Sequence, residues 1–234
     1  MVKASEIIQK AQTLLIDPEA VRWPLPELAG WIDSAINAIL IAKPSANTHS
    51  ITVDLEKGTK QKLPTDIDPR PMMFIAARRN INPDGTPGKA VTPVSIQKMD
   101  MSDPDWHSER RKRPAALHYL FDEKNPTEYF VYPANDGKGK LDITVACEVA
   151  PIVATGDPDD IKSYEVPVGL PEPYSEPIID YVCYRAQTKD ATGADAGRGA
   201  LHYQAFAQAI GIKTQVEANS SPNARRTVDA ARQS

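Results

Sequence analysis

The chain has 234 residues, of which 41% are hydrophobic and 25% charged, and its formal net charge is −4. This composition is typical of a globular protein with one large domain or two smaller lobes, and the acidic balance argues against general nucleic-acid binding. No run approaches the roughly 18 apolar residues of a membrane span, so we expect no contact with a membrane.

Two amphipathic helices are predicted near the N-terminus. The first covers residues 4–16, where apolar side chains recur every three to four positions. The second begins at two prolines, which suit a helix start, and ends before Lys43-Pro44. Trp31 lies beside the apolar stripe of this second helix, so we expect its indole to be buried. The stripe consists of Leu28, Ile32, Ala35, Ile36 and Ile39.

Apolar residues alternate with polar ones in the middle of the chain, which predicts antiparallel strands. Residues 51–55 are expected to form a strand that turns at 56–59 and returns as a weaker strand over 60–63. A short apolar run at 72–76, bounded by turn signals, predicts a buried strand.

The clearest hairpin of the sequence joins residues 117–121 to residues 129–132. A second turn, at 135–139, leads into a predicted strand over 141–149. The stretch from 151 to 173 is rich in proline and acidic residues, which is typical of a long surface loop.

Helical spacing returns over residues 179–186 and 203–210, and Gly211 is well placed to end the last helix in the left-handed conformation. Residues from 214 onward contain almost nothing to bury, so we expect a flexible tail that orders only on a partner. The sequence therefore predicts an α+β fold, a helical bundle with an inserted antiparallel β-rich lobe. The expected boundaries are 1–46 and 172–213 for the bundle, 47–171 for the β-rich lobe and 214–234 for the extended tail.

No spacing of residues predicts catalysis, a cofactor or a metal site. The four histidines show no ligand spacing with one another or with the two distant cysteines, Cys147 and Cys183, which also predict no disulfide and a reducing cytoplasm. The acidic residues 157–160 lack the glycine and the distal glutamate of a calcium loop. Glycine patterns typical of nucleotide binding or of a nucleophilic serine do not occur. A small hydrolase that uses a pair of carboxylates stays open as an alternative, because it needs no short motif.

One basic run and the C-terminal tail supply the candidate partner-binding residues. The basic run indicates either a solvated loop or a patch for phosphate or for an acidic protein surface. Trp106 precedes this run in a predicted loop, where an exposed tryptophan is typical of a contact. In the tail, two valines are available as anchors and three arginines as partners of acidic groups. The candidates are Trp106, Arg110, Arg111, Lys112, Arg113, Val216, Arg225, Arg226, Val228 and Arg232.

A set of short motifs occurs in a characteristic order along the chain, although none of them is specific alone. They are Arg22-Trp23, Glu27-Leu28, Trp31-Ile32, Lys43-Pro44, Gly58-Thr59, Leu63-Pro64, Pro104-Asp105-Trp106, Tyr129-Phe130-Val131-Tyr132-Pro133, Asp180-Tyr181-Val182-Cys183-Tyr184-Arg185-Ala186, Lys189-Asp190-Ala191, His202-Tyr203-Gln204-Ala205-Phe206 and Gly211. From about Ile7 to Gly211 this set resembles the head-to-tail adaptor proteins of tailed bacteriophages. Pro24 departs from the pattern, since a Ser, Thr or Asp cap is expected at that helix start.

The resemblance implies a structural protein of the virion neck, made in the host cytoplasm, without catalysis or cofactor. Such adaptors form a ring, usually of twelve copies, between the portal protein and a tail or nozzle protein, and DNA passes through the ring without sequence-specific binding. C-terminal segments of similar proteins often reach onto the portal. A head-completion or tail-terminator ring is the alternative within structural proteins. A sugar-binding module would explain exposed aromatic residues but not the match along the whole chain.

Overall fold

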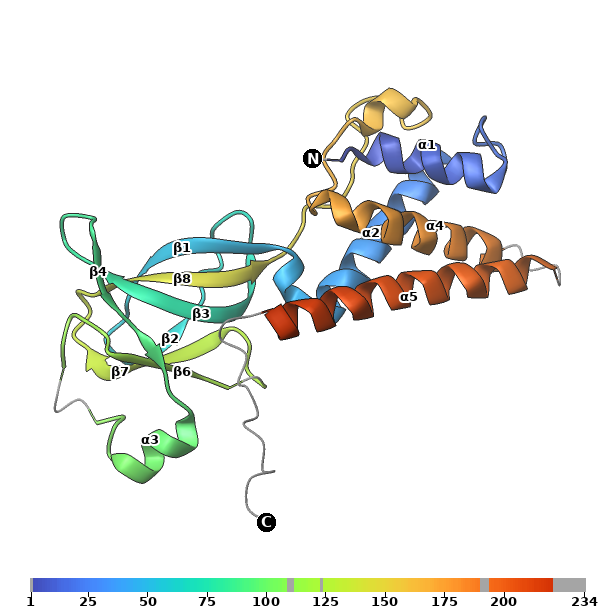
Figure 1. The fold of residues 1–234 in the computed structure, drawn as a ribbon. Coiled ribbons are helices and arrows are strands. Elements are labelled where there is room, and N and C mark those ends of the chain that lie inside the picture. Colours follow the sequence, from blue (N-terminus) through green and yellow to red (C-terminus); the bar gives the residue numbers. More distant parts are fainter. Residues whose placement is uncertain (1, 109–111, 123, 190–193, 221–234) are drawn as a thin grey trace, which may run out of the picture. The chain divides into compact units, whose positions relative to one another are not determined.

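The structure is a computed structural model that describes the backbone of residues 2–108, 112–122, 124–189 and 194–220. Contacts divide the chain into two compact units (Figure 1). The helical unit comprises residues 1–43 and 151–234, and the β-rich unit comprises residues 44–150. The fold is α+β, as the sequence predicts, with the β-rich unit inserted between two segments that both belong to the helical unit.

The first two helices form where the apolar periodicity predicts them. They are α1 (Ala4–Leu15) and α2 (Leu25–Ala42), and the whole predicted stripe of α2 is buried. Trp31 is only 7% exposed, and its ring lies 5.7 Å from the ring of Trp23. The prediction that this indole belongs to the core is therefore confirmed.

Helix α2 corrects one expectation, because it is long and apolar enough to cross a membrane by length and composition alone. Its 18 residues have a mean hydropathy of 1.2, whereas we expect from the sequence no run that approaches a membrane span. Half of these 18 residues are buried inside the protein, and a core helix of a globular protein can be equally long and apolar.

A buried carboxylate fixes the loop between α1 and α2. Helix α1 ends at Leu15, the next residue, Ile16, adopts the left-handed conformation, and Asp17 follows. The Asp17 carboxylate accepts backbone hydrogen bonds from Val21 at 3.0 Å, from Arg22 at 3.0 Å and from Trp23 at 2.8 Å. Pro24, the residue before α2, supplies no side-chain cap. The ordered loop therefore presents the start of α2 without the capping side chain that the sequence pattern led us to expect.

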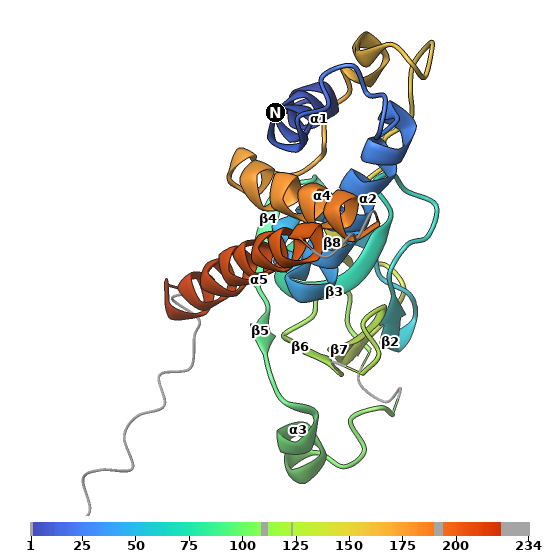
Figure 2. The ribbon, with the colours of Figure 1, turned by 90° about the vertical axis from the view of Figure 1, so that its right-hand side faces the viewer.

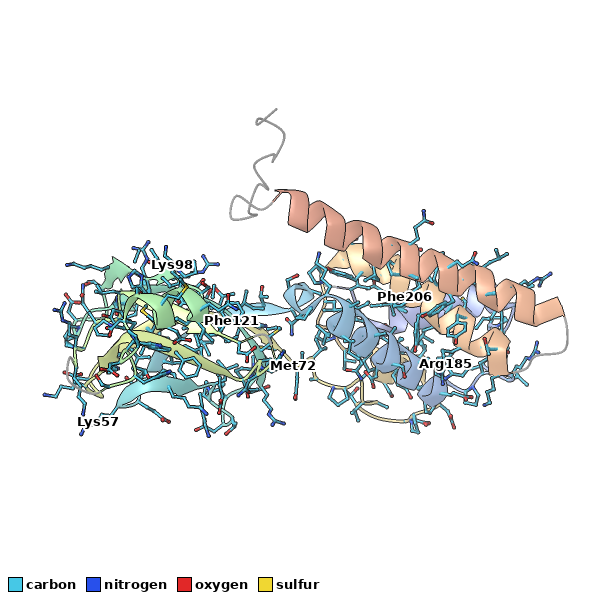
Figure 3. All side chains as sticks on the ribbon, turned by 90° about the horizontal axis from the view of Figure 1, so that it is seen from below. Lys57, Met72, Lys98, Phe121, Arg185 and Phe206 are labelled. Carbon is cyan, nitrogen blue, oxygen red and sulfur yellow. The ribbon has the colours of Figure 1, made fainter. Side chains whose placement is uncertain are left out.

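Helix α4 (Ser175–Lys189) contacts α1, α2 and the last helix, α5 (Ala194–Ser220). Gly199 permits the close approach of α4 and α5, because a Cβ there would lie 3.1 Å from Thr188 Oγ1. Phe206 of α5 points toward α4, and its ring lies 5.0 Å from that of Tyr181 (Figure 3).

Helix α5 continues past Gly211, so the prediction that this glycine ends the helix is wrong. A glycine inside a helix costs only about 1 kcal/mol relative to alanine. The residues that follow, such as Lys213, Gln215 and Glu217, favour a helix enough to continue it. Residues 214–220 are therefore the last turns of α5 rather than an extended tail, and residues 221–234 lie outside the described part of the chain.

Residues 151–171, which the sequence predicts to be part of the β-rich lobe, belong instead to the helical unit. Backbone hydrogen bonds join Ala4 N–H to the Val166 carbonyl at 2.8 Å and Val168 N–H to the Val2 carbonyl at 3.0 Å. Tyr164 is buried. The stretch from 151 to 173 is thus partly a core segment rather than only a surface loop. It contains the 3₁₀ turn η3 (Ile161–Tyr164), and η4 (Glu172–Tyr174) follows.

The strands of the β-rich unit are β1 (Thr48–Asp54), β2 (Gly58–Lys62), β3 (Pro71–Ile81), β4 (Pro87–Ala90), β5 (Thr92–Pro93), β6 (His118–Phe121), β7 (Glu128–Asn135) and β8 (Lys140–Cys147). They form two four-stranded sheets, with strand orders β1-β8-β3-β4 and β2-β7-β6-β5. Short helix α3 (Ile96–Ser102) lies beyond β6 and β7 in both ribbon views (Figure 2). The 3₁₀ turn η1 (Pro44–Ala46) precedes β1.

Strand pairing confirms one predicted hairpin and corrects another. Strands β6 and β7 are antiparallel, with Tyr119 opposite Val131, as predicted. Strand β1, however, pairs with β8, while β2 pairs with β7 in the second sheet. The chain changes sheets at residues 55–58, where Leu55 is buried and Gly58 has a φ of 109°. Residues 51–63 therefore form no hairpin, and β3 is longer than the predicted run.

The aromatic core of the β-rich unit lies between strands of both sheets. Phe74 of β3 stacks on Tyr129 of β7 with ring centroids 4.4 Å apart, and its ring meets the edge of Tyr119 at 5.6 Å. Strand β8 contributes three fully buried aliphatic side chains to the same cluster, Leu141, Ile143 and Val145.

Candidate interaction surfaces

Trp106 is buried, so the expectation that it is an exposed contact residue is wrong. It is 3% exposed and belongs to a small apolar cluster with Met99 and Leu120. The indole N–H donates to Asp100 Oδ1 at 2.7 Å, and the ring meets Phe130 edge-on at 5.7 Å. The aromatic residue therefore attaches α3 and the following turn to the sheet. The position of Trp106 in a predicted loop does not show which apolar residues bury it.

Part of the predicted basic run lies at one end of the β-rich unit, where three chain segments meet. Leu55 N–H donates to the Gly139 carbonyl at 2.8 Å. Arg113 N–H donates to the Ala134 carbonyl at 2.9 Å, and Asp136 N–H donates to the Arg113 carbonyl at 3.3 Å. Hydrogen bonds thus join residues 54–58, 112–114 and 134–140. We define the basic end as the cationic side chains on these segments: Lys57, Lys112, Arg113, Lys138 and Lys140.

A fully buried amide, Asn135, holds the basic end together. Its Nδ2 donates to the Pro114 carbonyl at 2.9 Å. Its Oδ1 accepts from the backbone N–H of Gly137 at 2.8 Å and of Gly139 at 3.2 Å. One side chain therefore satisfies three backbone groups from two segments, which fixes the turn that carries Lys138.

The glycines of this turn are required by its geometry. Gly137 has a φ of 86°, a left-handed conformation that other residues rarely adopt. A Cβ on Gly139 would collide with the Pro114 carbonyl oxygen and with Asn135 Nδ2. The turn predicted at residues 135–139 therefore also packs closely against the segment of residues 112–114.

The charges of the basic end are only partly compensated by nearby carboxylates. Lys140 Nζ lies 3.2 Å from Asp54 Oδ1. The Asp136 carboxylate accepts the Lys138 backbone N–H at 3.0 Å, and Glu56 is exposed on the first segment. Lys57, Lys138 and Arg113 are exposed to solvent.

A polar groove lies beside α3 in the same unit. Two cavities of about 210 and 580 Å³ share Asp103 and Tyr132 as lining residues. The Tyr132 hydroxyl donates to Asp103 Oδ2 at 3.2 Å, and the His118 ring stacks on Tyr132 at 6.2 Å. Within the described ranges, no group of three or more His, Cys, Asp or Glu side chains is placed to hold a metal ion.

The remaining candidates from the sequence cannot be placed as side chains. Arg110 and Arg111 lie outside the described residues, as do Arg225, Arg226, Val228 and Arg232. Val216 belongs to the last turns of α5. The structure therefore brings Lys112 and Arg113 to the basic end, and it adds three lysines that sequence analysis missed because they come from distant turns. Those three are Lys57, Lys138 and Lys140.

Comparison with known proteins gives one result that covers both units. A family model described as SU10 adaptor protein matches residues 2–226. Comparison with curated proteins finds no match. The family match extends over the whole range of the motifs that resemble phage head-to-tail adaptors, and it agrees with that resemblance.

Proposed function

Because this chain belongs to the SU10 adaptor protein family, we propose that it is a structural component of a tailed phage that forms a ring between the portal and the tail. The family match over residues 2–226 carries the proposal, since it includes the helical unit, the β-rich unit and α5. In this role the chain binds other proteins and performs no catalysis.

The proposed ring has three kinds of protein contact. Copies of the chain contact one another around the ring, with twelve copies as the expected number. The portal protein lies on one side and a tail or nozzle protein on the other, at the neck of the virion. DNA passes through the opening of the ring.

The mass of the purified chain, alone and mixed with a portal ring, tests this proposal. One copy has a mass of 25.6 kDa. We expect the mixture to contain a particle heavier than the portal by a whole ring of copies. A chain that leaves the mass of the portal unchanged would contradict the proposal. Binding to tail ends but not to the portal would instead identify a tail-terminator ring.

We also propose that the end of α5 and residues 221–234 attach the ring to the portal. Residues 214–234 contain Val216 and Val228 as apolar anchors and Arg225, Arg226 and Arg232 as cations. In this proposal the two valines contribute apolar contacts to the portal, and the three arginines pair with its acidic groups. Exposed charge pairs are screened beyond about 8 Å at physiological salt, so salt should weaken this attachment.

A chain truncated after Ser220 tests this part of the proposal. It keeps all described helices, so its melting temperature should equal that of the full chain. We expect it to dissociate from portal rings faster than the full chain. A truncated chain that binds the portal as tightly as the full chain would show that residues 221–234 have no such role.

A further inference from the structure

The basic end contrasts with the rest of this acidic chain. The whole sequence carries a net charge of −4, yet five cations and three carboxylates lie on the three joined segments of the basic end. All large apolar side chains that are exposed in the described structure lie on other segments. The surface is therefore locally positive and polar.

Hydrogen bonds and close packing constrain the backbone that carries the cations of the basic end. Asn135 is fully buried and binds backbone groups of its own turn and of the neighbouring segment at Pro114, and Gly139 lies against the Pro114 carbonyl. Binding at this surface would have to order only the side chains and not the loops. This lowers the entropic cost of binding for a ligand that needs several cations at once.

We propose that the basic end binds the phosphate backbone of duplex DNA without reading its base sequence. Phosphate contacts need spaced cations and polar groups, and they carry no sequence information. A stable protein interface normally has an apolar centre, and the basic end offers no large exposed apolar side chain among its described residues. The net charge of the chain argues only against binding by the whole surface, because charges beyond about 8 Å are screened.

The expected binding is weak for one copy and strongly dependent on salt. Neutralising about three phosphates, one for each of Lys57, Arg113 and Lys138, gives a slope of roughly −2.7 in a plot of log K against log salt, so affinity should fall about 40-fold between about 50 and 200 mM salt. Several copies acting on one DNA molecule would raise the apparent affinity without new contacts. The inference goes beyond the proposed function and does not depend on ring formation.

The test is a titration of a fluorescent duplex of arbitrary sequence with the full chain, at about 50, 100 and 200 mM salt and up to about 200 μM protein. The key variant replaces Lys57 and Lys138 by glutamine. The matched control replaces Lys98 and Lys124 by glutamine, and both are exposed lysines elsewhere in the same unit. Lys57 and Lys98 lie on different sides of the β-rich unit (Figure 3).

We expect the K57Q/K138Q variant to lose about tenfold in affinity at about 50 mM salt and to reduce the slope by about 2, since each phosphate contact contributes about one unit. The K98Q/K124Q control should stay within about twofold of the unaltered chain. The inference fails if the unaltered chain shows no salt-dependent binding, or if both variants lose the same affinity. It also fails if polyglutamate of equal charge competes better than DNA, which would indicate an acidic protein partner.

The same two variants distinguish this inference from the proposed function. Both should still add a ring's mass to the portal, because the substitutions change only exposed lysines. Rings of the unaltered chain that assemble on the portal but bind no DNA would overturn this inference and leave the proposed function intact. DNA binding by a chain that never joins the portal would support the inference and contradict the proposed function.

Discussion

Different interactions stabilise the interiors of the two units of this protein. In the helical unit, repeated apolar side chains of α1, α2 and α4 fill the core, and Leu28, Ile32 and Val182 are fully buried. In the β-rich unit an apolar core is also present, but buried amides connect its loops. Asn135 joins the turns of the basic end, and Asn80 binds the carbonyls of Lys89 at 3.0 Å and Ala116 at 2.8 Å.

The difference shows that periodic apolar residues and individual buried amides both contribute to specifying this fold. Helical cores depend on periodic apolar residues, which tolerate some repacking and are visible in one sequence. Loops held by a buried amide depend on a few hydrogen bonds, and loss of that amide leaves buried backbone groups without partners. We therefore expect substitutions in the helical unit to cost packing energy, and substitutions of the amides to disrupt the loops they hold.

Each unit contains one buried cysteine, and thiol reactivity gives the largest expected effect. Burial raises the pKa of Cys183 in the helical unit to about 12, and it also raises the pKa of Cys147 in the β-rich unit. Against an ordinary thiol, a shift of about three units lowers the thiolate fraction of Cys183 about a thousandfold. Mass spectrometry after brief alkylation at about pH 8 should find both thiols unmodified in the folded chain.

The same shifts predict how stability depends on pH. Because the folded state keeps both thiols protonated above the pKa of the unfolded chain, it binds more protons than the unfolded state there. Stability should therefore fall as pH rises above about 9. In increasing urea, the order in which Cys147 and Cys183 become reactive reports which unit opens first. Rapid labelling of either thiol without denaturant would contradict the buried positions.

Replacing Trp31 by alanine should destabilise the helical unit by about 3–5 kcal/mol, as other losses of buried aromatic side chains do. The measurement is urea unfolding followed by labelling of Cys183, which belongs to the same unit. Leu201, which is 66% exposed on α5, provides a control, and L201A should change stability by no more than about 0.5 kcal/mol. Equal effects of the two substitutions would show that Trp31 does not belong to the core.

Replacing Asn135 by alanine should destabilise the β-rich unit by about 2–4 kcal/mol, because the Pro114 carbonyl and two glycine N–H groups lose their partner. Labelling of Cys147 during urea unfolding measures this effect. Asn82 is an exposed amide bonded to Thr86 Oγ1 at 3.0 Å, so N82A is the matched control with a cost below about 1 kcal/mol. A neutral N135A would mean that the amide does not hold the turns.

Replacing Gly211 by alanine should stabilise α5 by about 0.5–1 kcal/mol, the smallest effect in this series. A Cβ at this position meets no atom within 4 Å, and the helix continues on both sides. If Gly211 instead ended the helix in the left-handed conformation, alanine would destabilise the chain. Thermal melting of the G211A variant, compared with the unaltered protein, decides between these two conformations.

The sequence could predict the helical unit well because its signal is repeated. The spacing of Leu28, Ile32 and Ile39 places a buried stripe on α2 without knowledge of its partners. The end of α5 was predicted too early, because the cost of one glycine in a helix is smaller than the sum of the helix-favouring residues after it.

The β-rich unit was harder to predict because its pairing is not local. The turn at 56–59 resembles a hairpin turn, yet its strands enter different sheets, and only long-range packing decides this choice. Asn135 looks like an ordinary turn residue, and no local pattern shows that its amide is buried. Trp106 likewise lies in a loop whose apolar partners, Met99 and Leu120, come from other elements.

The most direct test of the proposed adaptor role is to image the neck of the phage particle that carries this protein. We expect density between the portal and the tail into which the helical unit and the β-rich unit can be fitted separately, repeated around the axis, with α5 directed to the portal. Neck density that fits neither unit, or the presence of the protein only elsewhere in the particle, would contradict the adaptor role.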